Sequence, residues 1–161
     1  LKNADEGTTA NKYEYTIAAA ADELTPLLLK GELDVEAMSR AAAPLVGEHD
    51  FTSFCKVASG RKLLEDGRSL NRCLTTVHVS FVEEVGEPVV AIDVTGNAFL
   101  HNMVRIITGT LVEVGRGNHG PAWVGEVLAA CDRTVAGQTA PPEGLTFVDV
   151  RYPEGLLQPW T

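Results

Sequence analysis

The chain alternates strand-like and helix-like segments in an order that few folds satisfy. Strand-like sequence occupies residues 12–18, 72–81, 88–94 and 145–152, and helical spacing of apolar residues occupies 34–47, 97–114 and a stretch from 121 onward. The order strand, helix, strand, strand, helix, helix, strand is the split βαβ arrangement of ferredoxin-like domains. We therefore predict an α+β fold, with an antiparallel sheet and helices packed on one of its faces.

Capping and turn residues bound these segments. Asp34 is a suitable N-cap for the first helix, Gly47 ends that helix, and Pro44 shortens it. The sequence V-E-E-V-G-E between the second and third strands predicts a hairpin loop. Asn97 is placed to cap the long central helix, which we expect to run to about residue 114.

Length and charge limit the class of protein. Of the 161 residues, 45% are hydrophobic and 22% charged, which is the composition of one globular domain. We place this domain at 12–153, with a loose segment at 1–11 and a tail at 154–161. The formal net charge of −9 excludes a small, strongly basic nucleic-acid binder. No apolar run approaches a membrane span and no leader pattern is present, so we expect a cytoplasmic protein without a membrane partner.

The spacing of the cysteines indicates neither a disulfide scaffold nor a zinc cluster. Cys55, Cys73 and Cys131 are widely separated and form no CxxC pair, and the four histidines show no ligand spacing with them. Disulfide scaffolds and zinc clusters both require closer spacing. We therefore expect three reduced thiols and no metal site.

Polar residues interrupt the long apolar helix on one side. His101, Arg105 and Thr108 follow the spacing i, i+4, i+7, with Gly109 beside them. This stripe has two interpretations. It is either a solvated edge of the helix, or Arg105 enters a cleft and holds a carboxylate or phosphate, for which a planar guanidinium is suited. A guanidinium among apolar neighbours needs a partner, because an unpaired buried charge is strongly destabilising.

Residues 56–72 concentrate positive charge. They hold five of the 13 basic residues: Lys56, Arg61, Lys62, Arg68 and Arg72. Glycines at 60 and 67 predict a surface excursion, which is either an ordinary solvated loop or an arm that contacts phosphates. The overall negative charge argues against tight RNA binding by this domain alone.

Two tyrosines, Tyr13 and Tyr15, share one face of the first strand. A tyrosine on a sheet face either packs across strands or stacks on an extruded base.

The central helix also carries a resemblance. The sequence N-A-F-L-H-N-M-V-R-I-I-T-G-T-L-V-E-V-G-R-G-N at 97–118 resembles the signature of the TruA-type tRNA pseudouridine synthases. The similarity extends in the same order to other segments: K-Y-E-Y at 12–15, D-V-E-A-M-S-R-A-A-A-P-L-V-G-E-H-D-F-T-S-F at 34–54, W-V-G-E-V-L-A-A-C-D-R-T at 123–134, and A-P-P-E-G-L-T-F-V-D-V-R-Y-P at 140–153. That family's fold consists of two split βαβ halves, and this chain resembles the second half.

The resemblance implies an isomerase that converts uridine to pseudouridine in the anticodon arm of tRNA. Tyr13 resembles the tyrosine that stacks on the flipped uracil, Arg105 the arginine near the catalytic carboxylate, and Leu145 the apolar residue against the target base. The chemistry needs a base held out of its stack and a carboxylate kept ionised by a cation, with no metal or cofactor. The candidate RNA contacts are Lys56, Arg61, Lys62, Arg68, Arg72 and His101.

Departures from the family limit what this chain does alone. The family's catalytic aspartate lies in an R-T-D-x-G-V-H-A-type motif of the first half, and the chain contains no such motif. Asp132 matches a structural segment instead. Asn11 and Lys12 replace the usual Arg-Arg, and His101-Asn102 replaces His-His. We expect the missing half to be the partner that supplies the aspartate, tRNA to be the substrate, and the assembly to be a homodimer.

We therefore predict that this chain alone has no isomerase activity. Two other interpretations stay open. One is a non-catalytic ferredoxin-like module that binds RNA or a protein, and the other is a metal-dependent enzyme.

Overall fold

The computed structural model describes residues 14–20, 33–84 and 87–152. Tyr13, the predicted segment at 1–11 and the predicted tail at 154–161 lie outside this part, and the domain boundaries stay a prediction. The described elements are β1 (Glu14–Ala20), α2 (Val35–Ala42), β2 (Gly47–Asp50), α3 (Val57–Glu65), β3 (Asn71–Glu84), β4 (Glu87–Gly96), α4 (Met103–Gly115), α5 (Trp123–Ala130) and β5 (Leu145–Arg151).

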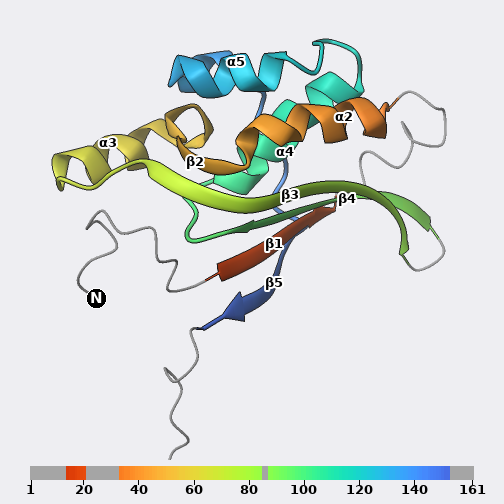
Figure 1. Ribbon diagram of the computed structural model, residues 1–161, viewed down its shortest axis with the longest axis horizontal. Helices are drawn as coiled ribbons and strands as arrows, with labels where there is room; N and C mark the ends of the chain where they lie inside the picture. The colour runs from red at the N-terminus through yellow and green to blue at the C-terminus, as the bar shows by residue number, and fades with distance from the viewer. Residues whose placement is uncertain (1–13, 21–32, 85–86, 153–161) are drawn as a thin grey trace, which may run out of the picture.

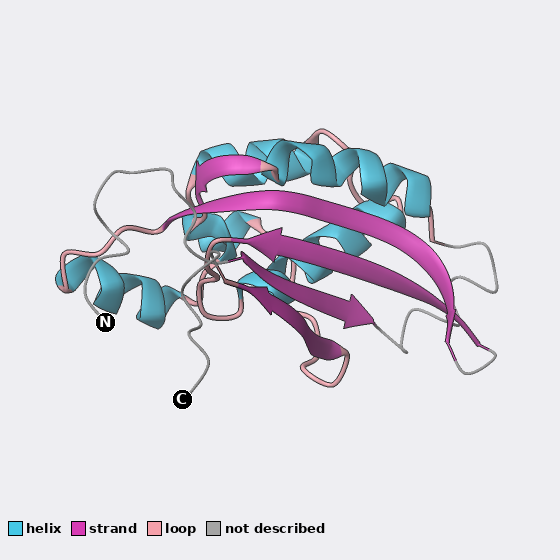
Figure 2. Ribbon diagram, turned by 60° about the horizontal axis from the view of Figure 1, so that its bottom comes forward, coloured by secondary structure: helices cyan, strands magenta, loops and turns pink. Residues whose placement is uncertain are grey.

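The strands form one antiparallel sheet in the order β2-β3-β4-β1-β5. If the short strand β2 is left out, the order is β3-β4-β1-β5. The first of these four strands along the chain, β1, lies between β4 and β5, and the second, β3, lies at an edge. This is the ferredoxin-like order. The helices α2, α4 and α5 lie together on one side of the sheet, as Figures 1 and 2 show. The predicted fold class is confirmed.

The first predicted helix is present with its predicted cap. Asp34 accepts a hydrogen bond from the backbone N–H of Ala37 at 2.8 Å, which satisfies one of the unpaired amides at the start of α2. The helix ends at Ala42, and Pro44 lies in a 3₁₀ turn over Ala43–Leu45. Proline therefore shortens the α-helix as expected.

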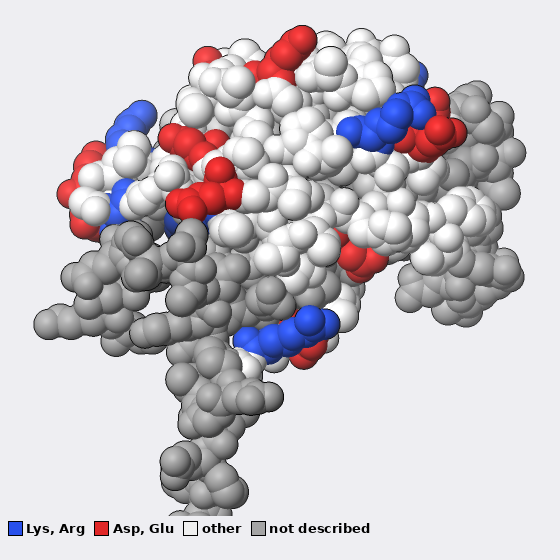
Figure 3. Space-filling view, viewed as in Figure 1, with Lys and Arg blue, Asp and Glu red and all other residues white. Residues whose placement is uncertain are grey.

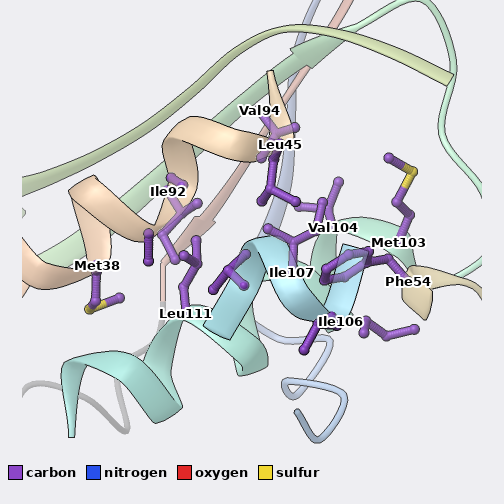
Figure 4. Close-up of a cluster of buried hydrophobic side chains, with 14 of the residues drawn as sticks. Met38, Leu45, Phe54, Ile92, Val94, Met103, Val104, Ile106, Ile107 and Leu111 are labelled. Carbon is purple, nitrogen blue, oxygen red and sulfur yellow. The ribbon is translucent and has the colours of Figure 1, made fainter. Parts of the chain in front are cut away.

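The helix α4 supplies the centre of the core. Ile106, Ile107 and Leu111 are each at most 1% exposed. Figure 4 shows them beside Met38 of α2 and side chains from β4. Burial of apolar surface from both the helices and the sheet is the main term that holds the two layers together.

The central helix begins later than predicted. Asn97 does not cap it. Instead, Asn97 donates from its backbone N–H to the carbonyl of Cys73 and accepts from the N–H of Cys73 through its side chain, both at 3.0 Å. It thereby extends the pairing of β3 with β4 by one residue. Asn102 is the N-cap residue, in the left-handed region at φ 63°.

The predicted surface excursion at 56–72 contains a helix, α3, rather than only loop. Gly60 lies inside this helix, where an added Cβ would stand 3.4 Å from Cys55 Sγ and 3.6 Å from Leu70 Cδ1. An added methyl group would therefore make only ordinary van der Waals contact with these neighbours. Gly67, at φ +70°, follows the end of the helix. A charged surface helix and a solvated loop have similar compositions, which explains why the sequence pattern did not separate them.

Candidate functional site

Arg105 lies in the first turn of α4, where two neutral acceptors hold its guanidinium. Its Nε donates to the carbonyl oxygen of Ala140 at 2.7 Å, and its Nη1 donates to Oδ1 of Asn102 at 3.1 Å. The backbone carbonyl of Arg105 in turn accepts from the N–H of Ala140 at 3.0 Å. The half-buried side chain is therefore fixed at two of its nitrogen atoms.

The charge of Arg105 is not neutralised by the side chains that the structure describes. None of those Asp or Glu carboxylates forms an ion pair with it, and its Nη2 has no hydrogen-bond partner among them. Carbonyl and amide oxygens stabilise the cation but leave its net charge unchanged. The site can therefore attract an anion or lower the pKa of a carboxyl group brought beside it.

Two glycines bring the partner of Arg105 into place. At Gly109, an added Cβ would collide with the carbonyl oxygen of Gln138, and at Gly137 it would stand 2.7 Å from Cα of Thr110. The N–H of Gly137 donates to Oγ1 of Thr110 at 3.0 Å. The segment 137–140 therefore runs directly against the backbone of α4, and this contact positions the carbonyl of Ala140.

The residues of the predicted polar stripe lie in different environments. Thr108 is 1% exposed, and its hydroxyl donates to the carbonyl of Val104 at 2.9 Å, so it belongs to the core and not to a solvated edge or a cleft. A threonine satisfies its hydroxyl inside a helix in this way. His101 is exposed and lies before α4 begins. Only Arg105 has the half-buried, polar environment that the cleft interpretation requires.

An open pocket of about 500 Å³ adjoins this turn. Four of the six candidate RNA contacts line it, together with other residues of α3 and the turn before α4: Ser59, Lys62, Leu63, Asp66, Arg68, Arg72, Phe99, Leu100 and His101. Ser59 Oγ lies 2.9 Å from Nδ1 of His101. We call these residues the basic pocket. One carboxylate, Asp66, lies among its four basic side chains.

The other two candidates, Lys56 and Arg61, are exposed and are not among the pocket-lining residues. The backbone N–H of Lys56 donates to the carbonyl of His101 at 3.1 Å, which ties the start of α3 to the turn before α4. On the face seen in Figure 3, Lys and Arg side chains are scattered among Asp and Glu side chains. That face therefore shows no continuous basic patch.

Leu145 begins β5 and is 38% exposed. It pairs with Ala19, whereas Glu14 pairs with Arg151 at the other end of β5. Six residues of strand separate these two ends, about 20 Å. Tyr13 is outside the described residues, and the side chain of Tyr15 is too, although its backbone pairs with Gly96 and Val150. The structure does not test whether these tyrosines share a face or contact a base.

Among the described residues, three titrating groups have a shifted pKa, and Arg105 is not a cause of any of these shifts. Burial raises the pKa of the Cys55 thiol, with an opposing effect of nearby Arg72. Burial, followed by the charge of Asp50, raises the pKa of Cys131. Hydrogen bonds from the N–H and then the hydroxyl of Thr134 lower the pKa of Asp132. Asp132 thus caps a short turn, consistent with a structural role for this residue.

The three cysteines form no disulfide with one another. Among the described residues, no group of three or more His, Cys, Asp or Glu side chains is arranged to hold a metal ion. None of the helices in the described ranges is long and apolar enough to cross a membrane.

Sequence patterns missed two of the groups that hold Arg105. Ala140 acts through its backbone carbonyl, which carries no side-chain signature. Asn102 was noted only as a departure from the His-His pattern. Its position three residues before Arg105 on the same helix was the available signal, because side chains at this spacing contact each other.

Comparison with known proteins shows which proteins this chain resembles in sequence. A family model described as tRNA pseudouridine synthase matches residues 41–153. A protein named tRNA pseudouridine synthase A from Brevibacillus brevis is 53% identical over 120 residues, covering 74% of this chain and 45% of the relative.

Proteins of the same name from Vibrio campbellii and Chloroflexus aurantiacus are each 42% identical. Both alignments cover 91% of this chain, and they cover 53% and 52% of the relatives. The chain spans about half the length of the curated relatives it matches.

Proposed function

The chain belongs to the tRNA pseudouridine synthase family, an isomerase family, and from this premise we propose that it forms the arginine-bearing half of an enzyme that isomerises uridine in tRNA. In this proposal the catalytic aspartate comes from a segment outside this chain. The reaction breaks the bond between uracil N1 and the ribose, turns the base, and joins the ribose to C5; C5 loses a proton and N1 takes one up. The target uridine lies in the anticodon arm.

The environment of Arg105 carries this proposal. Its guanidinium is fixed by Ala140 and Asn102, and no described carboxylate neutralises it. A carboxylate from another segment would find a preformed cation there. A nearby cation lowers the pKa of a carboxyl group and keeps it ionised, which the aspartate needs in order to act. Arg105 thus keeps the catalytic aspartate ionised and does not itself form a bond to the substrate.

We assign the base contact to Tyr13 or to Leu145. Either Tyr13 stacks on the flipped uracil or Leu145 packs against it, because Leu145 lies about 20 Å from the Glu14 end of the strand pair, too far for one base to touch both ends. The exposed apolar surface of Leu145 supports the second role. In the register of β5 with β1, Leu145 lies at the strand end away from Glu14. The two roles are therefore tested by separate substitutions, Tyr13→Phe and Leu145→Ala, each assayed for binding and for turnover.

The basic pocket binds the phosphate backbone of the tRNA. Lys62, Arg68 and Arg72 converge on it with His101, and an acidic protein needs such a local concentration of positive charge to bind RNA. Lys56 and Arg61 lie at its periphery and contribute less. Arginine is suited to this task because its planar fork matches a phosphate.

The edge of the sheet at β5 receives the missing half. Phe147 and Val148 follow each other along this strand and are 59% and 55% exposed, so apolar surface is open on both of its faces. Within the described residues β5 pairs with β1 alone. An edge strand with exposed apolar side chains favours pairing with a further segment. We also propose that the complete protein is a homodimer, which sedimentation of that protein tests.

The test is reconstitution of activity. The part of the Brevibacillus brevis relative that precedes the match is joined to this chain, and release of tritium from [5-³H]uridine in tRNA is measured. We expect turnover by the joined protein and none by this chain alone. Turnover by this chain alone would show that the aspartate from another segment is not needed. A joined protein that is folded and binds tRNA without turnover would favour a non-catalytic RNA-binding module.

A further inference from the structure

We propose that Asn102 is the residue that positions Arg105 for the reaction, and this inference rests on the proposed function. Asn102 caps α4, and its Oδ1 accepts from Nη1 of Arg105 at 3.1 Å. Nothing in the composition of the helix requires an amide at this position. The role follows from the geometry of a single turn.

The backbone of Asn102 places its side chain toward the helix. Its φ of 63° lies in the left-handed region, which asparagine tolerates better than most residues with a side chain. Its carbonyl accepts from the N–H of Ile106 at 2.9 Å and so begins the helical pattern. Its side chain makes no capping hydrogen bond to the backbone. The side-chain amide therefore accepts a hydrogen bond from Arg105 and does not cap a backbone N–H of the helix.

Of the two hydrogen-bond acceptors of Arg105, one is close to it in the sequence and the other is distant. The carbonyl of Ala140 holds Nε, and the amide of Asn102 holds Nη1. Fixing both nitrogens sets the plane of the guanidinium and leaves Nη2 without a partner among the described residues. Because a planar fork binds a carboxylate with directional hydrogen bonds, its orientation decides whether an incoming carboxylate is paired correctly.

An amide suits this role better than a carboxylate. A neutral amide orients the guanidinium and leaves its charge available to the catalytic aspartate. A carboxylate at the same place would accept the same hydrogen bond but would neutralise that charge. The chemistry therefore distinguishes Asn102 from both glycine and aspartate, although all three fit a left-handed turn.

The first measurement follows Arg105 in this chain without any substrate. In a ¹⁵N-labelled sample, the Nε–H resonance of Arg105, assigned by its loss in Arg105→Lys, reports how rigid the side chain is. We expect Asn102→Gly to increase the mobility of this group. Asn118→Gly, at an exposed asparagine beyond the other end of α4, is the matched control and leaves it unchanged. Equal mobility in Asn102→Gly and the unsubstituted chain would overturn the proposal.

The second measurement uses the joined protein described above. We expect Asn102→Gly to lower kcat about tenfold to a hundredfold, the range for one lost hydrogen bond to a charged group, with little change in KM. Asn102→Asp should lower it at least as far. If Asn102 only shaped the turn, both variants would keep the unsubstituted kcat, and that result would refute the role.

A double-mutant cycle separates this proposal from the proposed function. In an Arg105→Ala background, Asn102→Gly should have no further effect on turnover, because the group that it positions is absent. An undiminished effect in that background would show that Asn102 acts without Arg105. A change in Arg105 mobility combined with unchanged turnover of both single variants would instead count against the catalytic role of Arg105.

Discussion

The two ends of helix α4 serve different purposes. From Thr108 to Gly115 almost every side chain is buried, and Gly137 and Gln138 pack against the backbone there. At the other end, Asn102 and Arg105 are half-buried and make polar contacts. The comparison shows how one rigid element contributes stability through its packed part and holds a charged group at its open end. Substitutions should therefore affect stability at one end and turnover at the other.

Gly109→Ala should have the largest effect. The added Cβ would collide with the backbone carbonyl of Gln138, and a backbone atom cannot move aside as a flexible side chain can. We expect the free energy of unfolding, measured in urea, to fall by about 3 kcal/mol.

Gly125→Ala on α5 is the matched control for that substitution. Its Cβ would meet only Pro44, at 3.5 Å, and alanine favours the helix, so we expect a gain of about 0.5–1 kcal/mol. If the two substitutions changed the free energy of unfolding equally, the close contact between α4 and residues 137–140 would not be what makes glycine necessary at position 109.

Arg105→Lys should change turnover and leave the fold intact. Lysine keeps the charge but cannot hold Ala140 and Asn102 simultaneously with a planar group. In the joined protein we expect turnover to fall about a hundredfold, equivalent to about 2.7 kcal/mol. The urea midpoint of this chain should shift much less than in Gly109→Ala. A large loss of stability with normal turnover would reverse the comparison between the two ends of α4.

Removing charge from the basic pocket should have a smaller effect. We expect Lys62→Ala and Arg68→Ala each to weaken tRNA binding by the joined protein several-fold, and to reduce the slope of log Kd against log salt by about one. Arg40→Ala is the control, because Arg40 pairs with Glu36 on α2, outside the pocket. Equal losses in all three variants would indicate binding by overall charge.

The smallest effect should come from Asp132. Hydrogen bonds from Thr134 lower its pKa in the folded chain below the ordinary value of 3.8, so the ionised form stabilises the fold. This stabilisation is present above the unfolded pKa and is lost as the pH falls through the folded pKa. Urea midpoints of Asp132→Ala and the unsubstituted chain should therefore differ at pH 7 and converge as the pH falls through the folded pKa of Asp132. A difference that persists at the lowest pH would indicate a contact independent of charge.

Sequence patterns were sufficient where local chemistry decides structure. Asp34 caps its helix, and the order of the elements gives the fold. The predicted hairpin joins two alternating strands, although these strands extend into the predicted loop, to Glu84 and from Glu87. Sequence patterns were insufficient where distant residues decide. Asn97 and Asn102 are both suitable caps by type, and only the length of the β3–β4 pairing determines which one begins the helix.

The candidate site, too, was predictable from the sequence only in part. Arg105 was identified because a charge on an apolar helix is conspicuous in the sequence. The residues that hold it were not, since one acts through a backbone carbonyl that lies 35 residues away along the chain. The exclusion of Thr108 from the site likewise required the structure, because spacing alone cannot show that its hydroxyl is satisfied within the helix.

Chemical rescue shows whether turnover depends on the guanidinium of Arg105. Arg105→Gly in the joined protein removes the guanidinium and leaves space for a soluble one. Single-turnover release of tritium from uridine-labelled tRNA is then measured with increasing ethylguanidinium, against the same concentrations of ethylammonium. We expect a slow rate that rises with ethylguanidinium and much less with ethylammonium. A rate for Arg105→Gly equal to that of the unsubstituted joined protein, without response to either compound, would contradict this expectation.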